Sequence, residues 1–228
     1  MGRNRGTDDR SGDALFAITA VTLLTSLPLL SQLFVFLPWL RPLTFGSTLV
    51  LGVFDLVVIL AIVNGIACRL TDPGRVPSTW SSPPPTQPTA DLPSSTYCHK
   101  CNIGKPPRTH HCRRCERCVL RMDHHCKWLN TCIGHGNQPH FIRFLLFTVL
   151  STLLCALLLL ARLLSLVLSI IHFIHTDQKH TQAPGLGEIT VMAVVLCVLV
   201  PVGSILGMML YQQVMESRPK NLVFVYVH

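Results

Sequence analysis

The stretch from Cys98 to Cys132 constrains this chain more than any other part of its sequence. Its 35 residues contain seven of the ten cysteines and five of the eleven histidines. Zinc in proteins takes four ligands, usually Cys thiolate or neutral His, and CxxC pairs on tight turns often supply two of them. Cys98-x2-Cys101 and Cys112-x2-Cys115 are two such pairs. The stretch therefore holds enough candidate ligands for about two tetrahedral zinc sites.

One cysteine of this stretch stands in a pattern that favours covalent chemistry. Asp123-His124-His125-Cys126 places a carboxylate, an imidazole and a thiol within four residues. A carboxylate that orients a histidine, which in turn takes the thiol proton, is a general arrangement for activating a cysteine nucleophile. The spacing alone leaves open which cysteine carries no metal.

The spacing also leaves other interpretations open. A zinc module that binds protein or nucleic acid would use CxxC pairs and carry basic residues too, although the HxxxH half of a DNA-reading finger is missing. A disulfide framework fits less well, because CxxC pairs beside histidines have metal-ligand spacing. Taken alone, His124 would be a metal ligand or a surface histidine. Its place between Asp123 and Cys126 favours the role of a base.

The whole pattern is CxxC, x9, HCxxCxxC and then DHHC-x-W-x-x-x-C. It closely resembles the cysteine-rich domain of the DHHC-type protein S-acyltransferases, the palmitoyltransferases. The resemblance covers residues 98 to about 144 at motif level. Asp72-Pro73-Gly74 and Gly134-His135-Gly136-Asn137 also resemble motifs of this family. The resemblance implies an all-α integral membrane fold of four transmembrane helices, with the cytosolic zinc-binding domain between the second and third helices.

The resemblance also implies a role for individual residues. Cys126 would be the nucleophile, His124 its base and Asp123 the group that fixes the His124 tautomer. Two structural zinc ions would each have four ligands, Cys98, Cys101, His111 and Cys118 for the first, and Cys112, Cys115, His125 and Cys132 for the second. Metal binding would then supply much of the folding free energy of a stretch with almost no apolar core.

A long-chain acyl-CoA, palmitoyl-CoA above all, is the co-substrate that the resemblance implies. Membrane-associated proteins would be the acceptors, and no nucleic-acid partner is expected. The residues expected to contact the acyl chain are Trp128, Phe141, Phe144 and Ser151. Ser151 lies ten residues after Phe141, roughly 15 Å deeper at helical rise. Its small side chain would leave room for longer acyl chains.

Composition places the rest of the chain in a membrane. Of the 228 residues, 49% are apolar and only 13% are charged, with a mean hydropathy of +0.45, which is typical of membrane proteins. Four apolar segments are long enough to cross about 30 Å of hydrocarbon, namely residues 14–40, 43–68, 141–169 and 189–211. Pro28 and Pro38 are expected to kink or end the first of them.

The sequence divides into six parts on this basis. They are a polar N-tail (1–13) that we expect to be disordered, the first two spans (14–68), a Pro/Ser-rich linker (69–97), the cysteine-rich domain (98–140), the last two spans (141–211) and a short C-tail (212–228). Lys and Arg number three in the N-tail, eleven in residues 69–143 and two in the C-tail, against one in each opposite loop. The positive-inside rule therefore predicts that both termini and the cysteine-rich domain are cytosolic. We expect a Golgi or ER membrane.

Polar and small residues inside the spans are expected to serve the helix bundle. Asp55 lies in mid-span, where a carboxylate is costly, and a structural hydrogen bond is the preferred interpretation. Arg162 either extends to the far interface or bends its helix end inward. Gly203-x3-Gly207 provides a small-residue face, which we expect to pack inside the bundle rather than in a dimer.

Three departures from the family pattern keep a second function open. Lys127 stands where the family commonly has Pro, and Thr131 where Asn is common. After Tyr211 only QQVMESRPKNLVFVYVH follows, without the family's Thr-Thr-x-Glu motif, so we expect either a short C-tail or an incomplete chain. The alternative is a catalytically weak or inactive membrane scaffold whose zinc module binds partners. The intact Asp-His-His-Cys sequence favours the acyltransferase.

Overall fold

The computed structural model describes residues 5–80, 97–176 and 185–216. Most of the expected linker and C-tail lies outside these residues. The chain forms two compact units, one of residues 1–24 with 63–141 and the other of residues 25–62 with 142–228. The first contains the cysteine-rich domain and the second most of the long helices.

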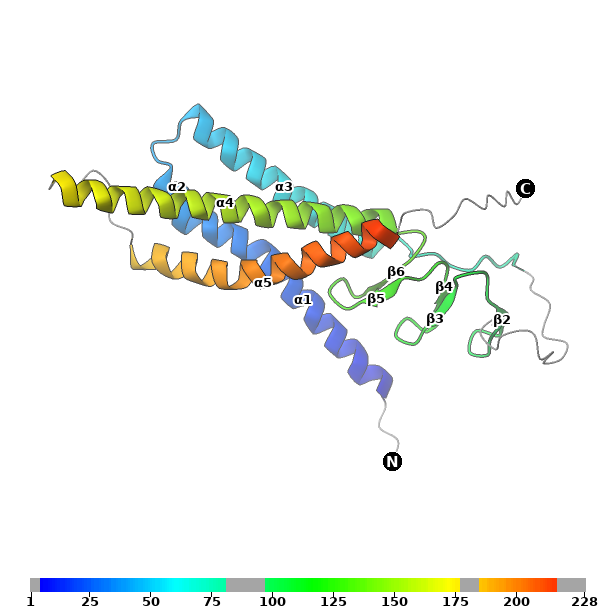
Figure 1. The fold of residues 1–228 in the computed structure, drawn as a ribbon. Helices are drawn as coiled ribbons and strands as arrows, with labels where there is room; N and C mark the ends of the chain where they lie inside the picture. The colour runs from blue at the N-terminus through cyan, green and yellow to red at the C-terminus, as the bar shows by residue number, and fades with distance from the viewer. Residues whose placement is uncertain (1–4, 81–96, 177–184, 217–228) are drawn as a thin grey trace. The chain divides into compact units, whose positions relative to one another are not determined.

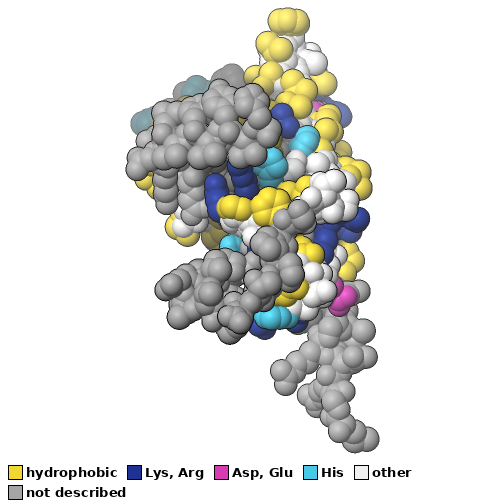
Figure 2. Space-filling view, turned by 90° about the vertical axis from the view of Figure 1, so that its right-hand side faces the viewer, with side chains coloured by type: hydrophobic (Ala, Val, Ile, Leu, Met, Phe, Trp, Pro, Cys, Tyr) yellow, Lys and Arg dark blue, Asp and Glu magenta, His cyan; other side chains and the backbone are white. Residues whose placement is uncertain are grey.

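Long helices make up most of the described chain (Figure 1). In order they are α1 (Arg5–Ser31), the π-helical segment η1 (Gln32–Phe36), α2 (Leu37–Trp39), α3 (Phe45–Leu70), α4 (Gln138–Thr176) and α5 (Leu186–Glu216). Among the described residues, four segments are long and apolar enough to cross a membrane, namely Gly12–Trp39, Phe45–Leu70, Gln138–His175 and Leu186–Met215. In Figure 2, patches of hydrophobic side chains lie between basic, histidine and other polar side chains on the described surface. These findings confirm a multi-pass membrane protein with four helical spans.

The first helix begins earlier than the sequence predicts. The N-tail was expected to be disordered up to residue 13, but the chain is helical from Arg5. Asp13 is bound by side chains of Arg114 and His125. This contact with a distant part of the sequence holds the helix at Asp13, and no local pattern in residues 1–13 could have revealed it.

The helix type of the first span changes between its two prolines. Pro28 lies inside α1, and η1 begins four residues after it, before the short α2 that contains Pro38. A proline removes one backbone donor from a helix, and a π-helical turn is one of the known accompaniments of such a disturbance. The first span therefore continues to Trp39.

The second unit packs η1 and helices α3, α4 and α5 around one apolar core. Its buried members are Val35, Phe36, Leu51, Phe54, Cys155, Leu159, Met192 and Val195. Phe36 and Phe54 meet edge to face with 5.8 Å between ring centroids. In Figure 1, α4 and α5 lie side by side. A β-carbon added at Gly203 of α5 would lie only 2.7 Å from Thr152 Cγ2 of α4, so this glycine packs inside the bundle as expected. A β-carbon at Gly207 would meet none of the described residues within 4 Å, so the expected close packing is confirmed for Gly203 alone.

The two charged residues predicted inside spans both have polar partners. Gln32 Nε2 donates a hydrogen bond to Asp55 Oδ2 over 3.1 Å, which confirms the structural hydrogen bond. Arg162 points inward and donates to both oxygens of Glu188, over 2.5 and 3.1 Å. Its guanidinium also lies over the Trp39 ring, 5.9 Å from the centroid.

Three short β-hairpins build the cysteine-rich domain. Their strands are β1 (Tyr97–Cys98) with β2 (Ile103–Gly104), β3 (His110–Cys112) with β4 (Arg117–Val119), and β5 (His124–Cys126) with β6 (Thr131–Ile133). Cys98, Cys112 and Cys126 take the same place in the three hairpins and follow one another at intervals of 14 residues. The last residue of each turn adopts a positive φ, namely Asn102, Glu116 and Asn130. The domain is thus a threefold repeat of a cysteine-bearing hairpin.

The Asp72-Pro73-Gly74 segment ties the end of α3 to the second and third hairpins. Gly136 N–H donates to Pro73 O and Leu120 N–H to Gly74 O, each over 3.0 Å. The close approach depends on glycine, because a β-carbon at Gly134 would lie 2.6 Å from Pro73 O. The segment that ends the helix by its sequence therefore also fixes the domain to it.

Candidate active site and metal centres

The structure gathers eight Cys and His residues into two clusters. The first contains Cys98, Cys101, His111 and Cys118, and the second contains Cys112, Cys115, His125 and Cys132, with all ligand atoms of a cluster within 4.8 Å of one another. These are the groupings that the family resemblance implies. Each cluster takes a CxxC pair from one hairpin and a His and a Cys from the next, so a metal in either would join two hairpins. Three thiolates and one imidazole fit a closed tetrahedral zinc site.

Both histidines present the same ring nitrogen to their cluster. His111 Nδ1 lies 3.2 Å from Cys101 Sγ and 3.5 Å from Cys98 Sγ. His125 Nδ1 lies 3.4 Å from Cys115 Sγ, and 3.6 Å from the sulfurs of both other cysteines of its cluster. Burial lowers the pKa of His111, which favours the neutral ring that a metal requires.

The thiols of each cluster are close enough to shift one another's pKa. A hydrogen bond with Cys132 lowers the pKa of Cys115 to about 5. Burial, together with the neighbouring thiols of the first cluster, raises the pKa of Cys118 to about 12. A divalent cation at the centre would stabilise the thiolate form of every member, because metal binding releases the thiol protons.

Cys126 lies outside both clusters. The repeat explains why: the first two hairpins have a second cysteine three positions after the first, Cys101 and Cys115, whereas the third has Leu129. Cys126 therefore has no CxxC partner, and it is 5% exposed. Spacing within single motifs left the metal-free cysteine undecided, but the 14-residue repeat would have identified it.

Asp123 and His124 stand beside Cys126 in the arrangement of a general base. His124 Nδ1 lies 3.1 Å from Asp123 Oδ2. The Asp123 hydrogen bond and the Cys126 sulfur raise the pKa of His124 to about 9. The other ring nitrogen, Nε2, is buried and makes no well-aligned hydrogen bond to any of the described residues. Asp123 is itself fixed through its backbone, since its N–H donates to Ile133 O over 2.9 Å.

The residues expected to contact an acyl chain have different surroundings. Phe141 is 1% exposed and packs edge to face on His124. Trp128 is half exposed and meets Phe16 with 5.4 Å between centroids. Phe144 and Ser151 lie further along α4, in the second unit. Ser151 is buried and its hydroxyl donates to Thr148 O over 2.9 Å.

Asn137 is a site residue whose role the sequence did not specify. Its side chain is fully buried, and Nδ2 donates to Cys132 O over 2.8 Å and to Cys68 O over 3.1 Å. Its Oδ1 accepts from Gly134 N–H over 3.0 Å. One amide thereby joins the end of α3, strand β6 and the start of α4. The sequence showed Asn137 only as the last member of a Gly-His-Gly-Asn motif.

Comparisons with known proteins agree with this geometry. A family model described as DHHC palmitoyltransferase matches residues 92–221. The chain is 32% identical over 200 residues to the probable protein S-acyltransferase 13 of Arabidopsis thaliana, covering 79% of this chain and 62% of that protein. It is 41% identical over 122 residues to palmitoyltransferase PFA4 of Kluyveromyces lactis, covering 53% of this chain and 31% of that protein.

A mammalian relative shows the same similarity over a shorter stretch. Palmitoyltransferase ZDHHC3 of Rattus norvegicus is 31% identical over 103 residues, covering 44% of this chain and 34% of that protein. The chain thus spans between about a third and three fifths of the length of these three relatives.

Proposed function

Because the chain belongs to the DHHC palmitoyltransferase family, we propose that it is a protein S-acyltransferase that transfers a long-chain acyl group from acyl-CoA to cysteines of membrane-associated proteins. One observation carries the proposal. Cys126 lies outside both metal clusters, next to a histidine that a carboxylate orients. A metal-free thiol beside such a pair can act as a nucleophile.

The first half of the reaction loads the enzyme. His124 takes the thiol proton of Cys126 as its sulfur attacks the thioester carbonyl of palmitoyl-CoA. The carbon–sulfur bond to CoA breaks, the acyl group stays on Cys126, and the CoA thiolate leaves with the proton from His124. Asp123 keeps Nδ1 occupied, so that Nε2 is the nitrogen that exchanges the proton.

The second half transfers the acyl group. The thiol of a substrate protein gives its proton to His124 and attacks the acyl-enzyme carbonyl. The bond to Cys126 breaks, and its thiolate recovers the proton. The two halves make a ping-pong cycle with a covalent intermediate.

Zinc in the two clusters would hold the hairpins together and take no part in the reaction, since all four positions of each site are filled by protein ligands. Cys112 of the second cluster directly follows His111 of the first cluster, and His125 of the second cluster directly precedes Cys126. A metal in the second cluster therefore fixes the strand that carries Cys126.

The bilayer positions the substrates in this proposal. Lys and Arg concentrate in residues 69–143, which supports a cytosolic cysteine-rich domain. A Golgi or ER membrane is part of the proposal, and the charge distribution does not bear on it. The acyl chain would lie among the helices, with Trp128, Phe141 and Phe144 near the interface and Ser151 at the far end. Replacing Ser151 with Phe should then shift the preference toward shorter acyl-CoAs.

Autoacylation of the purified protein in detergent tests the proposal directly. Wild type, Cys126→Ser and the control Cys197→Ser, which replaces an exposed cysteine of α5, are incubated with labelled palmitoyl-CoA. We expect label in wild type and in the control, none in Cys126→Ser, and release of the label by hydroxylamine, which cleaves thioesters.

Equal labelling of wild type and Cys126→Ser in folded, zinc-replete protein would contradict intrinsic catalysis. The membrane scaffold that binds partners through its zinc module would then be the better account of the chain. Labelling of Cys197→Ser at the wild-type level would show that the loss of a cysteine does not by itself abolish labelling.

A further inference from the structure

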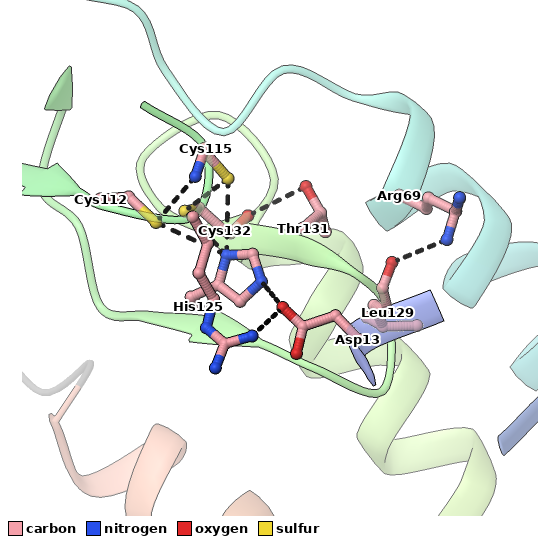
Figure 3. Close-up of polar contacts among 9 residues, drawn as sticks. Asp13, Arg69, Cys112, Cys115, His125, Leu129, Thr131 and Cys132 are labelled. Carbon is pink, nitrogen blue, oxygen red and sulfur yellow. Dashed lines mark hydrogen bonds and ion pairs between the residues drawn. The ribbon is translucent and has the colours of Figure 1, made fainter. Parts of the chain in front are cut away.

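A carboxylate from the first helix contacts the second metal cluster. Asp13 Oδ2 lies 3.2 Å from His125 Nε2, although the two residues are 112 positions apart in the sequence (Figure 3). Asp13 is 2% exposed, and its carboxylate also forms an ion pair with Arg114. A buried carboxylate is costly unless it is paired, and here it has one cation and one imidazole donor.

We propose that Asp13 is a positioning residue for the second metal centre, acting through His125. The inference rests on the proposed zinc sites. His125 presents Nδ1 to the three cysteines of its cluster and Nε2 to Asp13. When Nδ1 binds a metal, Nε2 carries the proton and donates it in a hydrogen bond to the carboxylate. Such a carboxylate fixes the tautomer and the ring orientation and makes the histidine a stronger ligand.

His111 of the first cluster has no equivalent carboxylate hydrogen bond in the described part of the chain. His111 Nδ1 faces Cys98 and Cys101, and none of the hydrogen bonds found among the described residues joins its Nε2 to a carboxylate. The two centres have the same donor set but different surroundings. Asp13 should therefore affect the second centre and leave the first unchanged.

A second contact, one turn along α1, holds Asp13 in place. Phe16 packs edge to face on Trp128, and Lys127 Nζ lies 5.7 Å from the centroid of the Phe16 ring. Residues three apart share a helix face, so Asp13 and Phe16 both face the third hairpin. They contact it on either side of Cys126, which follows His125 and precedes Lys127.

This arrangement gives the first span a role in the catalytic domain. Cys126 is the neighbour of His125 on strand β5, and a metal at His125 would fix that strand. By holding His125, Asp13 links the start of α1 to the position of the nucleophile. Replacing Asp13 should weaken metal retention at the second centre more than it changes the rest of the domain.

The test measures metal retention at each centre without using catalysis. The whole 228-residue chain, solubilised in detergent, is prepared as wild type, Asp13→Ala and Asp13→Asn. Each is analysed for zinc and then exposed to a chelator. Thiols released over time are alkylated and mapped by peptide mass spectrometry. Asp55→Asn, which changes a carboxylate bonded to Gln32 in the second unit, is the matched control.

We expect Cys112, Cys115 and Cys132 to be alkylated about tenfold or more faster in Asp13→Ala, the usual size of such an effect on metal affinity. The asparagine retains an acceptor for Nε2–H but loses the charge. The alkylation rate in Asp13→Asn should therefore lie between the rates in wild type and in Asp13→Ala. Thiols of the first cluster should react at the wild-type rate in every variant, which also shows that the domain is folded.

Two results would overturn the inference while leaving the zinc sites intact. One is an unchanged rate at the second cluster in Asp13→Ala, and the other is an equal acceleration at both clusters, which would make Asp13 a general support of the fold. A wild-type chain that holds fewer than two zinc ions would instead refute the proposed sites themselves, and the inference with them.

Discussion

The imidazole of His124 packs edge to face on the ring of Phe141, with 5.4 Å between the ring centroids. Phe141 comes from the first turn of α4 and is almost completely buried. The histidine is thus held by a hydrogen bond from one side, through Asp123, and by an aromatic ring from another. This position would let Phe141 help to orient the proposed base His124, in addition to the acyl contact expected from the sequence.

Replacing Phe141 with Leu should slow autoacylation without changing the acyl-chain preference. Leucine retains the apolar volume but loses the aromatic pair, which is worth about 0.5–1.5 kcal/mol. If the full energy of this contact stabilises the transition state, its loss should lower the autoacylation rate by about twofold to tenfold. Initial rates with a series of acyl-CoA lengths provide the measurement. A changed length preference at an unchanged palmitoyl rate would assign Phe141 to the acyl chain instead.

The repeat of hairpins makes Leu129 a second target. The Leu129→Cys substitution would place a second thiol three positions after Cys126, as in the CxxC pairs that build the two metal clusters. Such pairs bind zinc as thiolates, so we expect Leu129→Cys to bind additional zinc and to lose autoacylation as zinc is added. The Leu129 carbonyl accepts a hydrogen bond from Arg69, and this backbone contact is not altered by the substitution.

Leu129→Ala is the matched control for that experiment. It removes the same side chain but adds no thiol, so its activity should show the zinc dependence of the wild type. Elemental analysis and labelling at increasing zinc measure both variants. The same zinc content and the same response in the two variants would show that Leu129 does not keep Cys126 free of metal.

The sequence predicted the features that depend on local pattern. The length of the apolar segments predicted the four spans, and the CxxC pairs predicted the metal-binding stretch. Both signals lie within short, continuous segments of the sequence. The environment of Asp13 could not be predicted, since its partners Arg114 and His125 are over a hundred residues away. The inward direction of Arg162 also depended on Glu188 of another helix, so the sequence left two alternatives.

The Arg162–Glu188 pair leads to a prediction of non-additive stability. Both side chains are almost fully buried, so removing one leaves the other charge uncompensated, at a cost of about 3–5 kcal/mol. Arg162→Met and Glu188→Leu should each lower the thermal unfolding temperature in detergent. The double variant removes both charges and should be more stable than either single variant. Additive losses would show that the two residues act separately.

Gly203 and Gly207 of α5 should respond in opposite ways to substitution by alanine. A β-carbon at Gly203 would lie 2.7 Å from Thr152 Cγ2, whereas one at Gly207 would meet nothing within 4 Å. Gly203→Ala should therefore be destabilising, by about 1–3 kcal/mol for an overpacked contact. Gly207→Ala should be neutral or slightly stabilising, because alanine has the higher helix propensity.

The cause of the Gly203 effect can be isolated with a second substitution. Thr152→Ser removes the methyl group that the new β-carbon would strike and retains the hydroxyl that donates to Thr148 O. In the Thr152→Ser background, Gly203→Ala should cost much less unfolding free energy than in wild type. Thermal unfolding of the four variants of this cycle measures the coupling. If the cost is the same in both backgrounds, α4 and α5 do not pack through this pair of residues.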